Sequence, residues 1–169
     1  EMASFDCGTM NWMHMGIFNN NPDFLRTMGK AMQEAGVKPE IEVFDPGMIH
    51  DAAYYLKTGV LTAPMHFQFC MGCAGGITAT MEDLVFMKQT LEKVAPGSTW
   101  SAFGVGKGAM EIMYAAIAAG GHIRVGMEDN VMYRKGELAE SNMQLIARAR
   151  RVIEEFGCEV ATPDEARQI

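Results

Sequence analysis

Short apolar runs alternate along the chain with longer amphipathic stretches, which predicts strands that alternate with helices. From Phe24 to Ala35, apolar residues recur at helical spacing, Asn21-Pro22 provides an N-cap and a first-turn proline, and Gly36 stops the pattern. The expected helices cover residues 22–35, 46–58, 81–95, 107–119 and 141–156, with a short helical turn at 162–165. The expected strands are Met2–Gly8, Lys38–Phe44, Met65–Phe69, Thr99–Phe103 and His122–Val125.

Strands that alternate with helices indicate a parallel sheet in an α/β fold, in a single domain over residues 1–169. Two architectures fit: an open doubly wound sheet, or part of a (β/α)8 barrel. A barrel typically needs about 250 residues, so this chain would lack roughly 80 or more, which is about three βα units. No G-x-G-x-x-G sequence follows the first strand and no Walker A sequence occurs, so the nucleotide-binding form of the open sheet is not supported. Because the chain begins with Glu1 and enters a strand at once, we expect a fragment that lacks its N-terminal βα units.

Composition narrows the class of protein and its partners. With 49% hydrophobic residues, the chain can bury one substantial core. A formal charge of -7 and a pI near 5.1 argue against nucleic acid or an anionic membrane as the main partner. No apolar run approaches the length of a transmembrane helix, and no signal peptide opens the chain. The four cysteines are therefore expected to be reduced thiols of a cytoplasmic protein.

Polar side chains occur on, or directly after, every expected strand. They are Thr9 and Asn11 after the first strand, Glu42 in the second, His66 and Gln68 in the third, Ser101 in the fourth, and His122 and Arg124 in the fifth. One such residue is usually a core polar group with its hydrogen bonds satisfied. Polar residues on five strands are better explained by a shared site, because parallel strands present their carboxyl ends at the same edge.

The fifth strand leads directly into two adjacent acids, Glu128 and Asp129, just after Gly126. Taken alone, these acids are typical of a surface turn with an acidic tip. Arg124 changes the interpretation, because charged groups on a short apolar strand are costly to bury unless they are paired or bind a metal. We therefore interpret the turn as part of a site. For His122, deep in the strand, we expect a core or hydrogen-bonded role rather than metal ligation.

Other polar features carry weaker signals. Cys70 and Cys73 have the spacing of a redox pair, but they lie in a strand-to-loop turn without the helix start that such pairs use, which disfavours a redox role. Glycines between Gly72 and Gly76 suit either an anion cradle or a tight turn. His14 and His50 are expected on the surface or on a helix.

Three segments resemble the β-keto acid cleavage enzymes. They are Met2–Asn11, Pro39–Asp45 and His122–Asn130, of which the Arg-x-Gly-x-Glu-Asp-Asn block of the last is the most specific. The resemblance runs through essentially the whole chain. It implies a (β/α)8 TIM barrel, of which this chain would hold roughly the last five βα units. It also implies an enzyme that binds a divalent metal, usually zinc, and reacts a β-keto acid with acetyl-CoA to give acetoacetate and a new acyl-CoA.

The resemblance also implies roles for individual residues. Glu128 would be a metal ligand, and Arg124 and Asp129 would be catalytic. The substrate pocket would be lined by Thr9, Asn11 and Glu42. The other two metal ligands of such enzymes form a His-x-His pair, and no such pair occurs here. We therefore expect this chain alone to be inactive. We also expect the complete protein to be a homo-oligomer.

Two other functions remain open at this point. One is a non-catalytic half-barrel that binds or assembles with other molecules, and the other is a different metal-dependent barrel aldolase that works without acetyl-CoA. A half-barrel leaves sheet edges open to pairing with another chain. We therefore expect this chain to dimerise or aggregate on its own.

Overall fold

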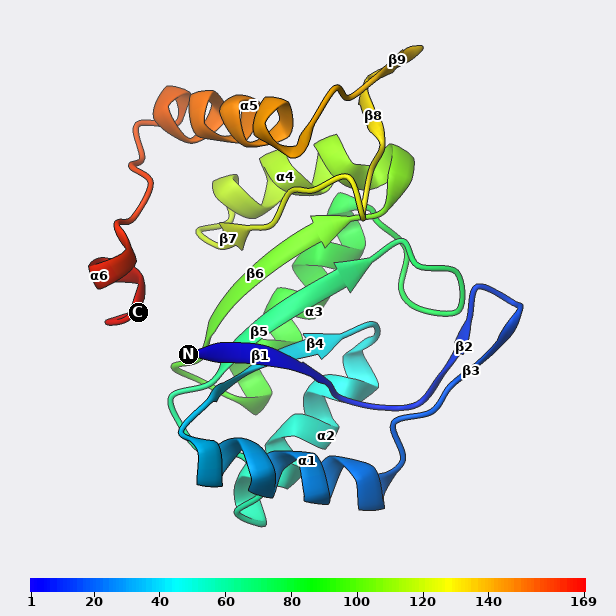
Figure 1. Cartoon of the computed structure of the whole chain (residues 1–169), viewed down its shortest axis with the longest axis vertical. Coiled ribbons are helices and arrows are strands. Elements are labelled where there is room, and N and C mark those ends of the chain that lie inside the picture. Colours follow the sequence, from blue (N-terminus) through cyan, green and yellow to red (C-terminus); the bar gives the residue numbers. More distant parts are fainter.

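A computed structural model describes all 169 residues and contains a five-stranded parallel sheet (Figure 1). The strands follow one another across the sheet in the order β1-β4-β5-β6-β7. Their bounds are β1 Met2–Asp6, β4 Lys38–Val43, β5 His66–Met71, β6 Thr99–Gly104 and β7 His122–Ile123. The order contains no reversal, whereas a doubly wound sheet reverses at its switch point. The predicted α/β fold with a parallel sheet is confirmed.

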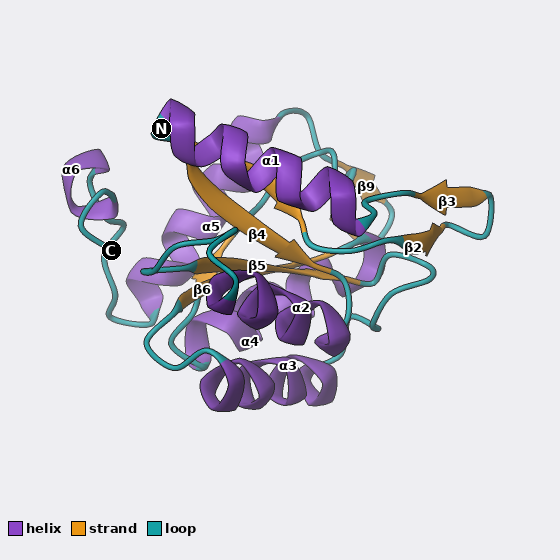
Figure 2. Cartoon of the chain, turned by 90° about the horizontal axis from the view of Figure 1, so that it is seen from below, coloured by secondary structure: helices purple, strands orange, loops and turns teal.

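The first four helices connect the successive strands of the sheet and pack on it, whereas the last two follow the fifth strand, and the final short helix stands apart from the sheet (Figure 2). Their bounds are α1 Pro22–Ala35, α2 Pro46–Lys57, α3 Met81–Val94, α4 Ala109–Ala118, α5 Asn142–Glu155 and α6 Pro163–Ala166, with a 3-10 turn, η1, at Gly106–Gly108. Asparagine, aspartate, threonine and serine side chains accept backbone N–H bonds at the starts of the first three helices and of α5, as N-caps do. No helix has the length and apolarity that crossing a membrane requires.

The sheet has one apolar face and one polar face, because side chains alternate along each strand. Apolar side chains in register across the strands, among them Phe5, Ile41 and Phe67, pack against buried residues of α1 to α4 and form the main core. The opposite face carries polar side chains in two rows. One row contains Ser4, Glu40, His66 and Thr99, and the next contains Asp6, Glu42, Gln68, Ser101 and His122.

Two small hairpins were not predicted. Strands β2 (Met10–Trp12) and β3 (Gly16–Phe18) pair in one, and β8 (Met132–Arg134) and β9 (Glu137–Leu138) pair in the other. The first hairpin turns through Met13 and His14, which adopt positive φ angles of 55° and 58°. Non-glycine residues rarely take this conformation, so the sequence gives no turn signal there.

The predicted ends of two elements are corrected. The fifth strand was expected to reach Val125, but only His122 and Ile123 pair with β6. The helix expected from Lys107 begins at Ala109, because the 3-10 turn precedes it. Arg124 consequently leaves the strand at its end, just where the acidic turn begins.

Candidate active site

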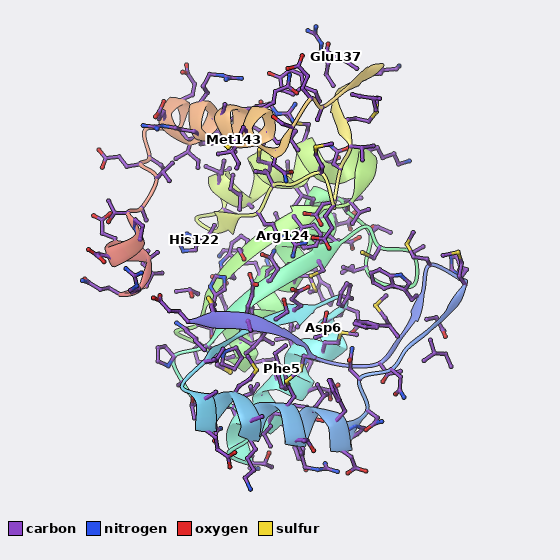
Figure 3. All side chains as sticks on the ribbon, viewed as in Figure 1. Phe5, Asp6, His122, Arg124, Glu137 and Met143 are labelled. Atoms are coloured by element: carbon purple, nitrogen blue, oxygen red, sulfur yellow. The ribbon has the colours of Figure 1, made fainter.

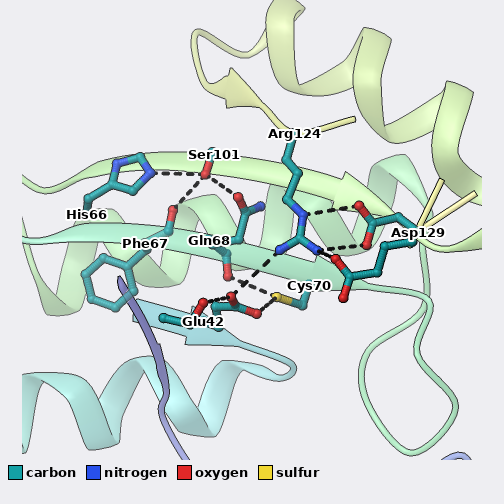
Figure 4. A network of polar contacts seen from close by, with 10 residues as sticks. Glu42, His66, Phe67, Gln68, Cys70, Ser101, Arg124 and Asp129 are labelled. Atoms are coloured by element: carbon teal, nitrogen blue, oxygen red, sulfur yellow. Dashed lines mark hydrogen bonds and ion pairs between the residues drawn. The ribbon is translucent and has the colours of Figure 1, made fainter. Parts of the chain in front are cut away.

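Arg124 is the centre of a cluster of charged side chains on the polar face (Figure 4). Its Nε and Nη2 donate to the two oxygens of Asp129, both at 3.1 Å, and Nη2 also donates to Glu128 at 2.7 Å. Nη1 lies 3.7 Å from an oxygen of Glu42, which comes from β4. The guanidinium also stacks over the Phe103 ring, 4.5 Å from its centroid. Residues distant in sequence therefore converge on one cation.

The turn after β7 is built so that Asp129 faces back toward Arg124. The carbonyl of Gly126 accepts the backbone N–H bonds of Asp129 and Asn130, at 3.2 and 3.1 Å. The Asp129 carbonyl accepts the N–H of Gly106 at 2.8 Å, which ties the turn to the end of β6. As a result the Asp129 side chain is only 8% exposed. The bidentate pairing with Arg124 is the geometry that guanidinium and carboxylate prefer.

Glu42 is held by hydrogen bonds from two neighbouring strands. Ser4 on β1 donates its hydroxyl to one carboxylate oxygen at 2.8 Å, and the thiol of Cys70 on β5 donates to the other at 3.3 Å. The Glu42 side chain is 10% exposed. Burial, followed by the nearby Glu42 carboxylate, raises the pKa of the Cys70 thiol well above its usual range, so the thiol keeps its proton. The two hydrogen bonds therefore hold the Glu42 carboxylate on the polar face of the sheet, close to Arg124.

Burial shifts the proton affinity of the acids in this cluster. Burial is the largest cause of a raised pKa of Asp129; the carboxylates of Glu128 and Glu42 also raise this pKa, and Arg124 acts to lower it. Burial, followed by the charge of Glu42, raises the pKa of Asp6 to about 6. Burial acts to lower the pKa of Arg124, but Asp129 and Glu42 outweigh it, so that the net pKa is raised. The arrangement keeps the guanidinium charged and makes Asp129 a better proton acceptor than an ordinary aspartate.

Glu128 is the only predicted metal ligand, and the structure places it at the rim of the cluster. Its side chain is 84% exposed, although one oxygen bonds to Arg124. No three histidine, cysteine, aspartate or glutamate side chains of the chain converge as a metal ion would require. The residues present therefore do not form a metal site by themselves.

Thr9 and Asn11, the other predicted pocket residues, lie away from the Arg124 contacts. Thr9 is exposed and donates to Asn19 at 3.4 Å, and Asn11 is exposed on β2. No hydrogen bond or ion pair joins either residue to Arg124. The structure thus brings together Arg124, Asp129, Glu128 and Glu42, but not the two residues after β1.

The expectation for His122 is wrong. It is exposed and forms no side-chain hydrogen bond, because β7 is an edge strand and ends one residue later. Figure 3 places it toward the edge where α6 lies, whereas Arg124 lies over the middle of the open face. His14 and His50 are exposed, as expected.

Tight geometry explains the glycine-rich loop. A Cβ on Gly75 would lie 1.8 Å from the Asn11 carbonyl oxygen, and one on Gly76 would lie 2.6 Å from that of Phe44. These glycines let the loop approach the first hairpin and the end of β4 closely.

Cys70 and Cys73 are both free thiols, and burial raises the pKa of each. A redox role has no support in this environment.

Sequence reasoning missed two features of the site. The spacing of Cys70 and Cys73 suggests only a redox pair, yet the Cys70 thiol holds Glu42. The sequence marks His66, Gln68 and Ser101 as polar strand residues but does not predict the hydrogen bonds between them. Strand register would have indicated the Gln68–Ser101 pair, since these two residues lie opposite each other.

Known proteins resemble this chain along its whole length. The family model described as beta-keto acid cleavage enzyme matches residues 1–169. The 3-keto-5-aminohexanoate cleavage enzyme of Fusobacterium nucleatum is 50% identical over 169 residues, which are 100% of this chain and 60% of that protein. The 3-dehydrocarnitine:acetyl-CoA trimethylamine transferase of Rhizobium meliloti is 39% identical, over 99% of this chain and 55% of that protein. The chain thus spans little more than half the length of these relatives.

Solved structures agree on the fold. The complex of ObcA with oxaloacetate superposes with a TM-score of 0.86 at 18% identity, over 99% of this chain and 44% of that one. A structural similarity at 18% sequence identity shows the fold alone. The family model matches all 169 residues, and this match shows the family. This chain belongs to the β-keto acid cleavage enzyme family.

Proposed function

We propose that this chain is the site-bearing part of a (β/α)8 barrel enzyme that reacts a β-keto acid with acetyl-CoA, giving acetoacetate and a new acyl-CoA. Family membership supports the reaction, and three of the relatives carry acetyl-CoA in their names. The strand order without reversal and the polar open face support a barrel segment, since such a face would line a barrel interior.

The observation that carries the proposal is the grouping of Asp129 and Glu42 around Arg124. The hydrogens on C2 of a β-keto acid are acidic, because both carbonyl groups stabilise the resulting carbanion. Asp129 is the base that removes one of them, since its burial raises its proton affinity. Arg124 keeps the carboxylate in place and balances its charge.

The remaining steps follow from the products. The C2 carbanion attacks the thioester carbonyl of acetyl-CoA and displaces the CoA thiolate. The thiolate then attacks the original ketone carbon, and the bond between that carbon and C2 breaks. The released acetoacetate carbanion takes back a proton from Asp129, which leaves the new acyl-CoA. Glu42, Thr9 and Asn11 are proposed to contact the substrate.

We propose a divalent metal, zinc, for the longer protein, with Glu128 as one of its ligands. The other ligands would have to lie outside this chain. The supporting feature is charge: Arg124 is a single cation among Glu42, Glu128 and Asp129. Metal analysis of the longer protein and of a Glu128→Gln variant tests this point, and equal zinc content in the two would contradict it.

The function is tested by joining this chain to the part of the Fusobacterium relative that it does not match. The completed protein is incubated with acetyl-CoA and a panel of β-keto acids, and acetoacetate and acyl-CoA are measured by mass spectrometry. We expect both products from the completed protein and none from the 169-residue chain alone. Cleavage that proceeds without acetyl-CoA would indicate an aldolase instead. Sedimentation of the same sample tests the proposed homo-oligomer.

A further inference from the structure

The last long helix, α5, is anchored beside the acidic turn, which comprises residues 126–130. Ala149 and Val152 of α5 pack with Met113 of α4 in a second, smaller core, so that the two helices lie side by side (Figure 1). Val125 lies against the same core, and the acidic turn begins at the next residue. The turn that carries Asp129 therefore starts where α5 is packed.

Side chains of α5 bind the chain on both sides of Asp129. The Asn142 side chain, at the start of α5, accepts the backbone N–H of Met127 at 2.8 Å. Beyond the turn, Arg148 Nη1 donates to the backbone carbonyl of Tyr133 in β8. The Arg148 guanidinium also stacks over the Tyr133 ring, 4.5 Å from its centroid. One helix thus holds the segment before and after the proposed base.

Arg148 has a further donor that no group of the chain accepts. Its Nε is shielded from solvent and has no hydrogen-bond partner. Buried donors without an acceptor are rare in folded proteins, so this nitrogen indicates a bound molecule. Arg148 lines a small cavity of about 20 Å³, whose other polar side chains are Arg124, Asp129 and Asn130. That volume holds one water molecule and excludes a substrate.

A water molecule in this cavity needs an acceptor for its own hydrogens, and the lining side chains narrow the choice. Arg124 can only donate. Asn130 is fully used, because its Nδ2 donates to the Met132 carbonyl at 2.8 Å and its Oδ1 accepts the Met132 N–H at 3.1 Å. Each carboxylate oxygen of Asp129 accepts one bond from Arg124 and keeps a free lone pair. Asp129 is therefore the side-chain acceptor that remains.

We propose that one water molecule in this cavity accepts the Arg148 Nε–H and donates to the Asp129 carboxylate, which makes Arg148 a positioning residue for the reaction. The inference rests on the proposed function, in which Asp129 takes the C2 proton. Arg124 holds the carboxylate from the polar face of the sheet, and the bridging water holds it from the side of α5. A base held from two sides keeps its angle to the C–H bond, and such alignment contributes directly to the rate.

Arg148→Lys removes only the proposed link. The Cε of lysine takes the place of the arginine Nε, so the donor to the water is lost. The lysine ammonium keeps the charge beside the Tyr133 carbonyl and ring. The matched control is Arg151→Lys, since Arg151 also lies on α5 and donates to the Tyr133 hydroxyl at 3.3 Å, but does not line the cavity. Arg148→Met removes the charge and both contacts.

The kinetic test uses these variants in the completed protein. Arg148→Lys should lower kcat about tenfold, the effect of one lost hydrogen bond to a charged group, and should leave KM for both substrates unchanged. Arg151→Lys should keep wild-type rates, and the unfolding midpoints of the two lysine variants should agree. If Arg148 served only to stabilise the fold, Arg148→Lys would keep full kcat, and Arg148→Met would lose stability and activity together. That result overturns the proposal.

The water site is tested in the unaltered 169-residue chain by proton–nitrogen NMR. The Arg148 Nε–H signal is identified by its loss in Arg148→Lys. We expect this proton to exchange slowly with solvent and to show a nuclear Overhauser effect to a long-lived water molecule. Asp129→Asn should shift the signal, and exposed Arg151 should show none of these effects. An Arg148 proton without contact to a bound water, or one that ignores Asp129→Asn, overturns the proposal.

The two tests separate this inference from the proposed function. A completed protein that converts acetyl-CoA, but whose Arg148 proton meets no bound water, retains the function and loses the inference. A bound water between Arg148 and Asp129, in a completed protein that never converts acetyl-CoA, retains the water site and loses the function.

Discussion

Replacement of Arg124 by methionine should destabilise the chain more than any other single change in the cluster. Asp129 and Glu42, at 8% and 10% side-chain exposure, would lose their only cation. Methionine keeps most of the apolar contact with Phe103 but supplies no charge. The cost is therefore mainly that of carboxylates left buried without a partner.

The expected loss of unfolding free energy at pH 7.5 is about 3 kcal/mol. Breaking a fully buried ion pair from one side costs roughly 3–5 kcal/mol. The lower end applies, because Arg124 is itself 29% exposed and Glu128, at 84%, contributes almost nothing. The matched control is Arg150→Met. Arg150 forms an ion pair with Glu154 at 2.8 Å, but the two side chains lie on the surface of α5 and are 70% and 53% exposed. The loss for this control should be much smaller than that of Arg124→Met, because ion pairs between exposed side chains contribute little to stability.

Urea unfolding followed by circular dichroism measures both variants. Without Arg124, the pKa of Asp129 rises further above its unfolded value. The charged Asp129 carboxylate therefore destabilises the variant at any pH above its pKa in the folded chain. This destabilisation disappears as pH falls toward the pKa of Asp129 in the unfolded chain, so the difference in unfolding free energy between variant and wild type should shrink from pH 7.5 to pH 4. A loss below about 0.5 kcal/mol at pH 7.5, or one that does not depend on pH, would refute the assignment of Arg124 as partner of buried carboxylates.

Two further stability predictions follow from named contacts. Asp6→Asn should stabilise the chain at pH 7.5 by about 1–2 kcal/mol. The pKa of Asp6 is raised from 3.8 to about 6 in the folded chain, so ionisation of its carboxylate destabilises the fold as pH rises from 4 to 7.5. Because the side chain is partly exposed, we take roughly half of the free energy that this shift corresponds to. Urea midpoints at pH 4 and 7.5 check it, and an equal effect at both would contradict it. Gly75→Ala should lower the unfolding free energy by about 2–3 kcal/mol, because the new Cβ would clash with the Asn11 carbonyl and the residue has a φ of 102°. The control is Gly97→Ala, where φ is 82° but no atom lies near the new Cβ, so the loss should be about 1 kcal/mol. Equal thermal midpoints for the two glycine variants would show that the close approach is not needed.

The sequence predicted those parts of the fold that depend on local signals. The starts of α1, α2, α3 and α5 were found because each has a capping residue at its first turn. The first hairpin escaped prediction because Met13 and His14 turn it without glycine or proline. The shortness of β7 was also missed, since it reflects pairing with β6 rather than a break in the apolar pattern.

The candidate site was predictable in part. Arg124 and Asp129 lie five residues apart around a turn, so the sequence indicates that they belong to one site, but it does not predict their bidentate pairing. Glu42 joins them from another strand, which the family resemblance implied and the register explains. The exposure of Glu128 and His122 could not be read from the sequence, because it depends on where β7 ends and on which strand forms the edge of the sheet.

Turnover by the completed protein tests the central claim most directly. Acetyl-CoA labelled in its acetyl group should deliver the label to acetoacetate, and Asp129→Asn should lower the rate by about a thousandfold or more while the protein still folds and binds substrate. An Asp129→Asn protein that transfers label at the wild-type rate would show that the Arg124 cluster is not the catalytic centre.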